Sequence, residues 1–243
     1  PAYNEENVIV SSVNNILQST YENFDVIVVN HGSTDDTLKI ARSTFRRNPR
    51  VKVCTQKNQG KWAAANRGFA KSESEIVVAI DADTILDPDA IGHLVQKMKD
   101  PRVAAVAGKV IVGNQRNLLT RFQAIEYLVG QNVDRRAYEA LNAIMVVPGA
   151  IGAWRREAVI EVGLYSPETM TEDADLTVSL IRAGYRVEYD ERALCYTEAP
   201  ETVKAFLAQR LRWTLGKLQT AWKHKGSIRE RRAVGLAAIP DQI

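Results

Sequence analysis

The chain has 243 residues, of which 45% are hydrophobic and 25% charged, the ordinary composition of a globular protein. Its net charge of +3 suits anionic substrates or an anionic surface without establishing either. The two cysteines, Cys54 and Cys195, lie too far apart in sequence to suggest a disulfide framework or a paired-cysteine metal site, so we expect a reducing compartment. No apolar run reaches the roughly 18 residues of a membrane span, so none is predicted within this sequence.

The first part of the chain alternates predicted helices and strands. A loop over Pro1–Asn7 leads into a helix that ends near Gln18. Short β-rich runs follow at Phe24–Val29 and Val51–Thr55, and an alanine-rich helix is predicted at Lys61–Ala70. Strands and helices at this spacing indicate right-handed βαβ units and a parallel sheet.

Two loops at predicted strand ends have residues that suit anions. The segment Asn30–Asp35 follows a strand and opens a helix capped by Ser33 or Thr34, where backbone N–H groups favour anions. The segment Lys57–Lys61 is basic and contains Gly60. Both segments fit ordinary βα turns equally well. No GxGxxG follows a strand and no GxxxxGK[ST] occurs, which counts against a dinucleotide site and a P-loop.

The stretch Glu75–Asp87 holds an apolar run, Ile76–Ile80, that ends in two carboxylates, Asp81 and Asp83. Five consecutive apolar residues between polar flanks predict a fully buried strand. Ligands of open α/β sheets sit beyond the carboxyl ends of the strands, where two acids can hold a divalent cation and the cation can bind phosphate. The same residues also fit a polar strand end followed by a turn.

Beyond Asp87 the strand–helix alternation loosens, and no linker interrupts it. The predicted helices are Asp89–Met98, Leu118–Leu141, Arg155–Val162, Glu172–Ala183 and Thr202–Lys223. The predicted strands are Val103–Val112, Ile144–Val147, Arg186–Tyr189 and Ala193–Tyr196, with a flexible loop at Gly149–Gly152.

Two segments in this second part combine residue types suited to chemistry. The segment Thr171–Asp173 opens a helix with two acids, which fits simple capping or, in a cleft, a general base. Gln209, Arg212 and Trp213 share one helical face. Arginine binds phosphate bidentately, and tryptophan offers a flat apolar surface to a sugar ring or to the protein core.

As a set, these motifs resemble the family-2 inverting glycosyltransferases. The motifs are PAYNEE, VVNHGSTDDT, KNQGK, DADT, PGAIGAW, TEDADL and QRLRW, and they cover almost the whole chain. The sequence looks most like the processive bacterial synthases of poly-N-acetylglucosamine, chitin oligosaccharides and hyaluronan. The resemblance implies an α/β, GT-A nucleotide-sugar transferase fold with a mostly parallel central sheet flanked by helices. It also implies a UDP-sugar donor, a divalent metal (Mg or Mn), and membrane helices flanking the catalytic domain.

The resemblance assigns roles to individual residues. Asp83 is expected to bind the metal and Asp173 to be the general base, with Glu172 and Arg212 as further catalytic residues. The residues expected to bind the nucleotide are Ala2, Tyr3, Glu5, Asn30, His31, Lys57, Lys61, Asp81, Gln209 and Arg212. The residues expected to contact the donor sugar or the acceptor are Gly149, Ala150, Trp154 and Trp213.

One departure from the family pattern concerns the nucleotide pocket. Relatives usually read DDGS or NDGS where this chain has Asn30–Ser33, so His31 replaces an acid expected to touch the uracil. A histidine can donate or accept a hydrogen bond but supplies no fixed negative charge at pH 7. This substitution puts donor affinity and base selectivity in doubt.

The expected function is transfer of a sugar, N-acetylglucosamine by resemblance, from a UDP-sugar to a growing β-linked oligo- or polysaccharide with inversion at the anomeric carbon. The alternatives are a non-processive transferase to a lipid or small acceptor, and a degenerate UDP-sugar-binding module. Nucleic acid is not an expected partner, because the basic stretch Arg46–Lys52 lacks interleaved aromatic residues.

The expected organisation is one catalytic domain over residues 1–243. Residues 1–112 form the nucleotide-sugar-binding half and residues 113–232 the acceptor-side half. Residues 233–243 resemble the start of a truncated membrane-proximal segment, and the basic stretch Lys223–Arg232 before it suits an anionic lipid surface. The chain opens on Pro1 rather than methionine, so we expect a soluble fragment of a longer protein at the cytoplasmic face of the bacterial inner membrane.

Overall fold

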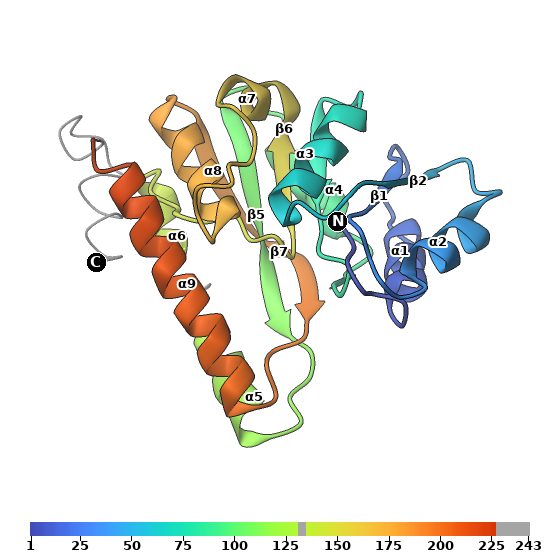
Figure 1. Cartoon of the computed structure of the whole chain (residues 1–243). Helices are drawn as coiled ribbons and strands as arrows, with labels where there is room; N and C mark the ends of the chain where they lie inside the picture. Colours follow the sequence, from blue (N-terminus) through green and yellow to red (C-terminus); the bar gives the residue numbers. More distant parts are fainter. Residues whose placement is uncertain (131–134, 227–243) are drawn as a thin grey trace.

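A five-stranded sheet flanked by helices forms the centre of the computed structural model, which describes residues 1–130 and 135–226 (Figure 1). The strands of this sheet, in spatial order, are β3 (Ile76–Ala79), β6 (Gly152–Arg155), β5 (Val103–Val112), β7 (Arg186–Thr197) and β4 (Ile85–Leu86). A second, two-stranded sheet pairs β1 (Val26–Asn30) with β2 (Val51–Thr55) in parallel. The α/β class with a helix-flanked central sheet is thus confirmed.

The pairing within the five-stranded sheet is mixed rather than mostly parallel. Strands β5 and β7 run parallel, whereas β6 is antiparallel to both β3 and β5, and β4 is antiparallel to β7. The difference comes from two strands that were not predicted: the two-residue β4, and β6, which falls on residues predicted to end a loop and start a helix. The predicted strand Ile144–Val147 is instead irregular chain that leads toward β6.

The helices begin and end within a few residues of their predicted positions. They are α1 (Ile9–Leu17), α2 (Thr37–Phe45), α3 (Lys61–Lys71), α4 (Ala90–Lys97), α5 (Leu118–Val129), α6 (Arg135–Ala140), α7 (Arg156–Glu161), α8 (Glu172–Arg182) and α9 (Val203–Lys223). The single helix predicted over Leu118–Leu141 corresponds to α5 and α6, and residues 131–134 between them lie outside the described part. The two strands predicted at 186–189 and 193–196 are halves of β7, whose register against β5 shifts between Gly108 and Lys109.

Strand β3 is less buried than its apolar run predicts. All four of its residues are half-buried. One edge of β3 pairs with β6, while a cavity of about 740 Å³ lies between β3 and β1, lined also by residues of α1 and α3. The prediction of a fully buried strand was wrong because this cavity, rather than a paired strand, lies beside β3.

Within the described ranges, no helix combines the length and hydrophobicity needed to cross a bilayer. The membrane-proximal segment expected at 233–243 and most of the basic stretch before it lie outside those ranges. The division of the domain into halves at residue 112 stays a prediction.

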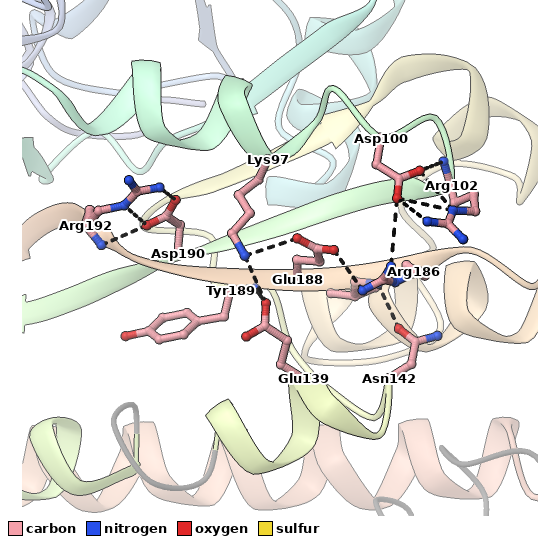
Figure 2. A network of polar contacts seen from close by, with 11 residues as sticks. Lys97, Asp100, Arg102, Glu139, Asn142, Arg186, Glu188, Tyr189, Asp190 and Arg192 are labelled. Carbon is pink, nitrogen blue, oxygen red and sulfur yellow. Dashed lines mark hydrogen bonds and ion pairs between the residues drawn. The ribbon is translucent and has the colours of Figure 1, made fainter.

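Side chains of α6 and the turn after it bond to the backbone of β7 (Figure 2). Glu139 Oε1 accepts a hydrogen bond from the Tyr189 N–H, and Asn142 Oδ1 accepts one from the Val187 N–H, both at 3.0 Å. Lys97 of α4 forms an ion pair with Glu139 at 3.4 Å. These contacts satisfy backbone donors on the edge of β7 that pairs with β4 at only two residues. They also fix the chain that continues from α6 toward β6.

Replacing Glu139 with alanine should destabilise the fold. The Glu139→Ala variant leaves the Tyr189 N–H without its acceptor, so the free energy of unfolding in urea should fall by about 1–3 kcal/mol. The matched control is Arg102→Ala, which breaks an exposed ion pair with Asp100 and should leave the urea midpoint unchanged. Equal urea midpoints for Glu139→Ala and the parent chain would contradict the role given to this network.

Candidate active site

A cavity of about 940 Å³ opens beyond the carboxyl end of β3, bounded by α5, α8, α9 and the loop before β6. Its lining includes predicted site residues that are far apart in the sequence. Those that line it are Lys61, Asp81, Asp83, Gly149, Ala150, Glu172, Asp173, Gln209, Arg212 and Trp213. Parallel strand ends and helix starts meet at this edge, which is where ligands of α/β sheets bind.

An ion pair lies on the cavity wall. Lys61 Nζ, at the first residue of α3, is 2.5 Å from Asp81 Oδ1 at the end of β3. Desolvation alone would lower the pKa of Lys61, but the charge and hydrogen bond of Asp81 outweigh it and raise that pKa above its usual range. A Cβ at Gly149 would lie 2.8 Å from Lys61 Nζ, so the loop before β6 approaches this pair closely because residue 149 has no side chain.

The start of α8 places Asp173 in the same cavity. Asp173 Oδ1 accepts a hydrogen bond from the Ala174 N–H at 2.9 Å. The hydroxyl of Thr177 donates to the Asp173 carbonyl at 2.6 Å and accepts from the Val147 N–H at 3.0 Å, which ties α8 to the loop below the cavity. Desolvation raises the pKa of Asp173, and the nearby Lys61 offsets only part of this rise. A carboxylate with a raised pKa is a better proton acceptor than a solvated one.

Two other carboxylates of the cavity, those of Glu172 and Asp83, also have raised pKa values. Desolvation, followed by the charge of Asp173, raises the pKa of Glu172. Desolvation, followed by the charge of Asp81, raises the pKa of Asp83, and Glu198 contributes in the same direction. Because a neighbouring carboxylate contributes to each of these two shifts, a bound cation would offset part of the repulsion between the acids.

Only two side chains in this cavity, those of Asp81 and Asp83, are placed to hold a metal in the described part of the chain. In the described part of the chain, no three His, Cys, Asp or Glu side chains converge as a metal site. Magnesium is commonly held by one or two carboxylates and completes its coordination with water and substrate phosphates. Asp83 fits that pattern with Asp81 beside it, because desolvation and then the charge of Asp81 raise the pKa of Asp83, and a bound cation would offset both.

The residues predicted to bind the base lie beside the cavity rather than in its lining. Ala2 forms a parallel bridge with Asn30 at the end of β1. The rings of Tyr3 and His31 stack, with centroids 5.2 Å apart and planes 23° from parallel. Desolvation lowers the pKa of His31, so the imidazole is neutral at pH 7. Desolvation, and then the charges of Asp83 and Asp81, raise the pKa of Glu5. Glu5 therefore lies close enough to these two cavity acids to interact with them electrostatically.

Two further predicted site residues also lie away from the cavity lining. Lys57 is exposed in the loop before α3. Trp154 is 1% exposed in the hydrophobic core, where its ring meets that of Tyr165 edge-on at 5.9 Å. The structure therefore corrects the prediction that Trp154 contacts sugar, because β6 turns its side chain into the core below Gly149 and Ala150.

The cavity also has lining residues that the sequence did not single out. Arg210, next to Gln209 on α9, pairs with Glu126 of α5 at 2.5 Å and lies over the Trp213 ring. Glu198 follows the end of β7 much as Asp81 follows β3, and an acid at a strand end is a signal that could have identified it. Nothing local predicts the pair between Arg210 and Glu126, since it depends on how α5 and α9 pack.

A family model described as glycosyltransferase like family 2 matches residues 1–216. The chain belongs to glycosyltransferase family 2. The poly-beta-1,6-N-acetyl-D-glucosamine synthase of Staphylococcus aureus strain MSSA476 is 32% identical over 215 residues, which are 88% of this chain and 52% of the relative. The synthase of the same name from Staphylococcus epidermidis is 31% identical over 216 residues, with the same coverage. The chain thus spans about half the length of these family-2 relatives.

Solved structures similar to this family-2 chain have the GT-A type of fold. The mannosyltransferase PcManGT from Pyrobaculum calidifontis, in complex with GDP-Man and Mn²⁺, has a TM-score of 0.77 and 24% identity, covering 100% of this chain and 70% of that one. Residues 1–349 of S. aureus TarS, in complex with UDP-GlcNAc, have a TM-score of 0.63 and 17% identity, covering 90% and 64%. The predicted family and fold are confirmed, whereas the roles of individual residues stay predictions.

Replacing Glu172 with glutamine should stabilise the fold at neutral pH. The pKa of Glu172 is raised above its ordinary value of 4.5, so the folded chain retains a proton that the unfolded chain releases. The stability of the parent chain therefore falls as the pH rises through this window. The Glu172→Gln variant lacks this loss, and should have the higher melting temperature at about pH 7.5, with the gap closing toward pH 4.5.

The exposed Glu73→Gln variant is the control for this measurement and should follow the parent chain at every pH. A Glu172→Gln variant that melts below the parent at neutral pH would show that the Glu172 carboxylate is stabilising, contrary to the raised pKa.

Proposed function

We propose that this family-2 domain transfers N-acetylglucosamine from a UDP donor to a growing β-linked polysaccharide, with inversion at the anomeric carbon. The observation that carries the proposal is one cavity holding a carboxylate of raised pKa, Asp173, opposite two cationic groups, Lys61 and Arg212. The donor sugar follows the names of the staphylococcal relatives and the UDP-GlcNAc in the TarS complex.

The proposed reaction is a single in-line displacement. Asp173 removes the proton from the acceptor hydroxyl as its oxygen forms a bond to the anomeric carbon. The bond from that carbon to the diphosphate breaks at the same time, and its electron pair leaves with UDP. Arg212, Gln209 and Lys61 bind the diphosphate, where their positive charge and hydrogen bonds stabilise the developing negative charge. Attack from the face opposite the leaving group inverts the anomeric centre.

Asp83 would hold a divalent cation, Mg or Mn, with Asp81 beside it. When bound, the cation would neutralise negative charge on the diphosphate. The excess of carboxylates at this wall and the Mn²⁺ of the PcManGT complex support this assignment. Trp213, half-buried against Tyr127, would stack against the acceptor sugar, and Gly149 with Ala150 would form the floor below the donor sugar.

The nucleotide would lie between the cavity and the stacked rings of Tyr3 and His31. Ala2, Asn30 and Glu5 border this position, and the neutral His31 would hydrogen-bond the base as either donor or acceptor. Lys57 would reach the nucleotide from the neighbouring loop. A degenerate binding module remains the second candidate, because His31 stands where relatives carry an acid.

The expected location is the cytoplasmic face of a membrane, and the surface of two helices supports it. One side of α5 and one side of α9 expose large apolar side chains, including Leu118 at 68% and Trp222 at 72%. The full set on α5 and α9 is Leu118, Phe122, Ile125, Leu128, Val129, Val203, Leu207, Leu211, Leu215, Leu218 and Trp222. Arg121 and Lys204 are exposed on the same two helices. Apolar faces edged by cations bind anionic lipid surfaces.

Replacing Asp173 with asparagine should abolish sugar transfer while leaving UDP affinity within about twofold, because an amide cannot accept the acceptor's proton. The assay follows label from UDP-GlcNAc into product, with Mg²⁺, Mn²⁺ or a chelator, and calorimetry measures UDP binding. The exposed Asp89→Asn variant serves as the control.

Full activity in Asp173→Asn would refute the base assignment. Short labelled products in place of polymer would identify a non-processive transferase, and UDP binding by the parent chain without turnover would identify a degenerate module.

Charged residues on the apolar side of α9 should prevent lipid binding. The double variant Leu207→Asp, Leu211→Asp should lower the partition coefficient onto vesicles of phosphatidylcholine and phosphatidylglycerol by about tenfold or more. The control is Ile160→Asp on α7, where an apolar side chain is also exposed. Unchanged sedimentation of the double variant with vesicles would rule out this surface as the lipid contact.

A further inference from the structure

The inner side of α9 contacts the two residues that precede α8, Met170 and Thr171, at successive helical turns. Arg212 Nη1 donates to the Met170 carbonyl at 3.4 Å, and Gln219 Oε1 accepts from the Met170 N–H at 2.8 Å. Between them, a Cβ at Gly216 would lie 2.5 Å from Thr171, so the two segments are in direct contact there. Residues 212, 216, 219 and 223 recur at helical spacing, so they form one continuous face.

This face ends at a buried charged group outside the cavity. Asp175 of α8 is 2% exposed and His224, the residue that ends α9, is 3% exposed. Asp175 Oδ1 lies 2.8 Å from His224 Nε2, and Asp175 Oδ2 lies 2.8 Å from Lys223 Nζ. Both oxygens of one buried carboxylate therefore bond to consecutive residues at the end of α9.

The bonds around His224 define its tautomer. Arg182, the last residue of α8 and about two helical turns beyond Asp175, has Nη1 3.2 Å from His224 Nδ1. A guanidinium can only donate hydrogen bonds, so His224 Nδ1 accepts and His224 Nε2 carries the proton that Asp175 accepts. Two residues of α8 thus hold opposite sides of one imidazole ring, which leaves the ring little freedom to rotate.

We propose that Asp175 and His224 form a positioning pair that sets where Arg212 and Gln209 lie relative to Asp173. The inference rests on the proposed function, in which these residues bind the diphosphate and remove the proton. Asp175 is two residues after Asp173 on α8, and His224 caps the carboxyl end of α9, the helix that carries Arg212. The pair therefore links the helix of the base directly to the helix of the diphosphate ligands.

The pair can affect Arg212 at a distance because a long helix moves as one body, so fixing one end limits the movement of side chains along it. Helix α9 has 21 residues, and the large apolar side chains on its outer side are exposed. Fixing its carboxyl end against α8 removes rotation and sliding that would move the Arg212 guanidinium. Misplacing such a group by about 1 Å can cost about a hundredfold in rate.

The experiment measures UDP affinity by calorimetry and amide hydrogen exchange over residues 203–223 in the full chain. Asp175→Ala and His224→Leu should raise the UDP dissociation constant about tenfold and accelerate exchange along α9. His224→Gln keeps a donor toward Asp175 and should restore both measurements to within about twofold of the parent chain.

The matched control is Asp190→Asn. Asp190 is equally buried, at 3%, and pairs with Arg192 at 2.7 Å on β7, away from α9. It should lower the melting temperature without changing UDP affinity or exchange in α9. Parent-like UDP affinity and exchange in His224→Leu would overturn the inference, and so would an equal loss of affinity in Asp190→Asn. If the parent chain binds no UDP, the proposed function fails, and the exchange measurement still decides the positioning role.

Discussion

The positive charge of one lysine, Lys61, stabilises the ionised form of four carboxylates in the cavity. Lys61 pairs directly with Asp81, and its charge also opposes the raised pKa values of Asp83, Glu172 and Asp173. These acids come from β3 and α8, which are about 90 residues apart in sequence. The close approach of Gly149 completes the arrangement, because a side chain there would displace the lysine. The end of β3, the start of α8 and the loop at Gly149 together hold these four acids near the single cation of Lys61.

Local patterns in the sequence predicted the parts of this site that local structure creates. Asp81 and Asp83 follow an apolar run, and Glu172 and Asp173 open a helix. The sequence therefore predicted that each acid lies at the end of a strand or the start of a helix. The strand β6 was not, because only four residues form it and its identity depends on the two strands that flank it. The burial of Trp154 follows from that strand, whereas its assignment as a sugar contact came from the family resemblance, which does not record where the side chain points. The cavity beside β3 depends on packing between distant segments, which no local pattern records.

Helix α9 has two unlike sides, and each imposes a different requirement on the same 21 residues. The inner side must keep Gly216 small and Arg212 within reach of the loop before α8. The outer side repeats leucines at helical spacing and exposes them. Because Gln209 and Arg212 belong to the same helix, anything that moves its outer side also moves these proposed diphosphate ligands. The proposed contact with a lipid surface and the proposed binding of the donor would therefore be mechanically related through one helix.

The side chains that bond to β7 have a consequence for how copies of this chain behave at high concentration. An unpaired strand edge is a template on which a strand of another molecule can add, and repeated addition leads to aggregation. Glu139 and Asn142 occupy the N–H groups that such a strand would need. Because they extend from a helix and a turn, they terminate the hydrogen-bond ladder without offering a new edge. The sheet is in this way closed to intermolecular growth along this part of β7 by two side chains rather than by an additional strand.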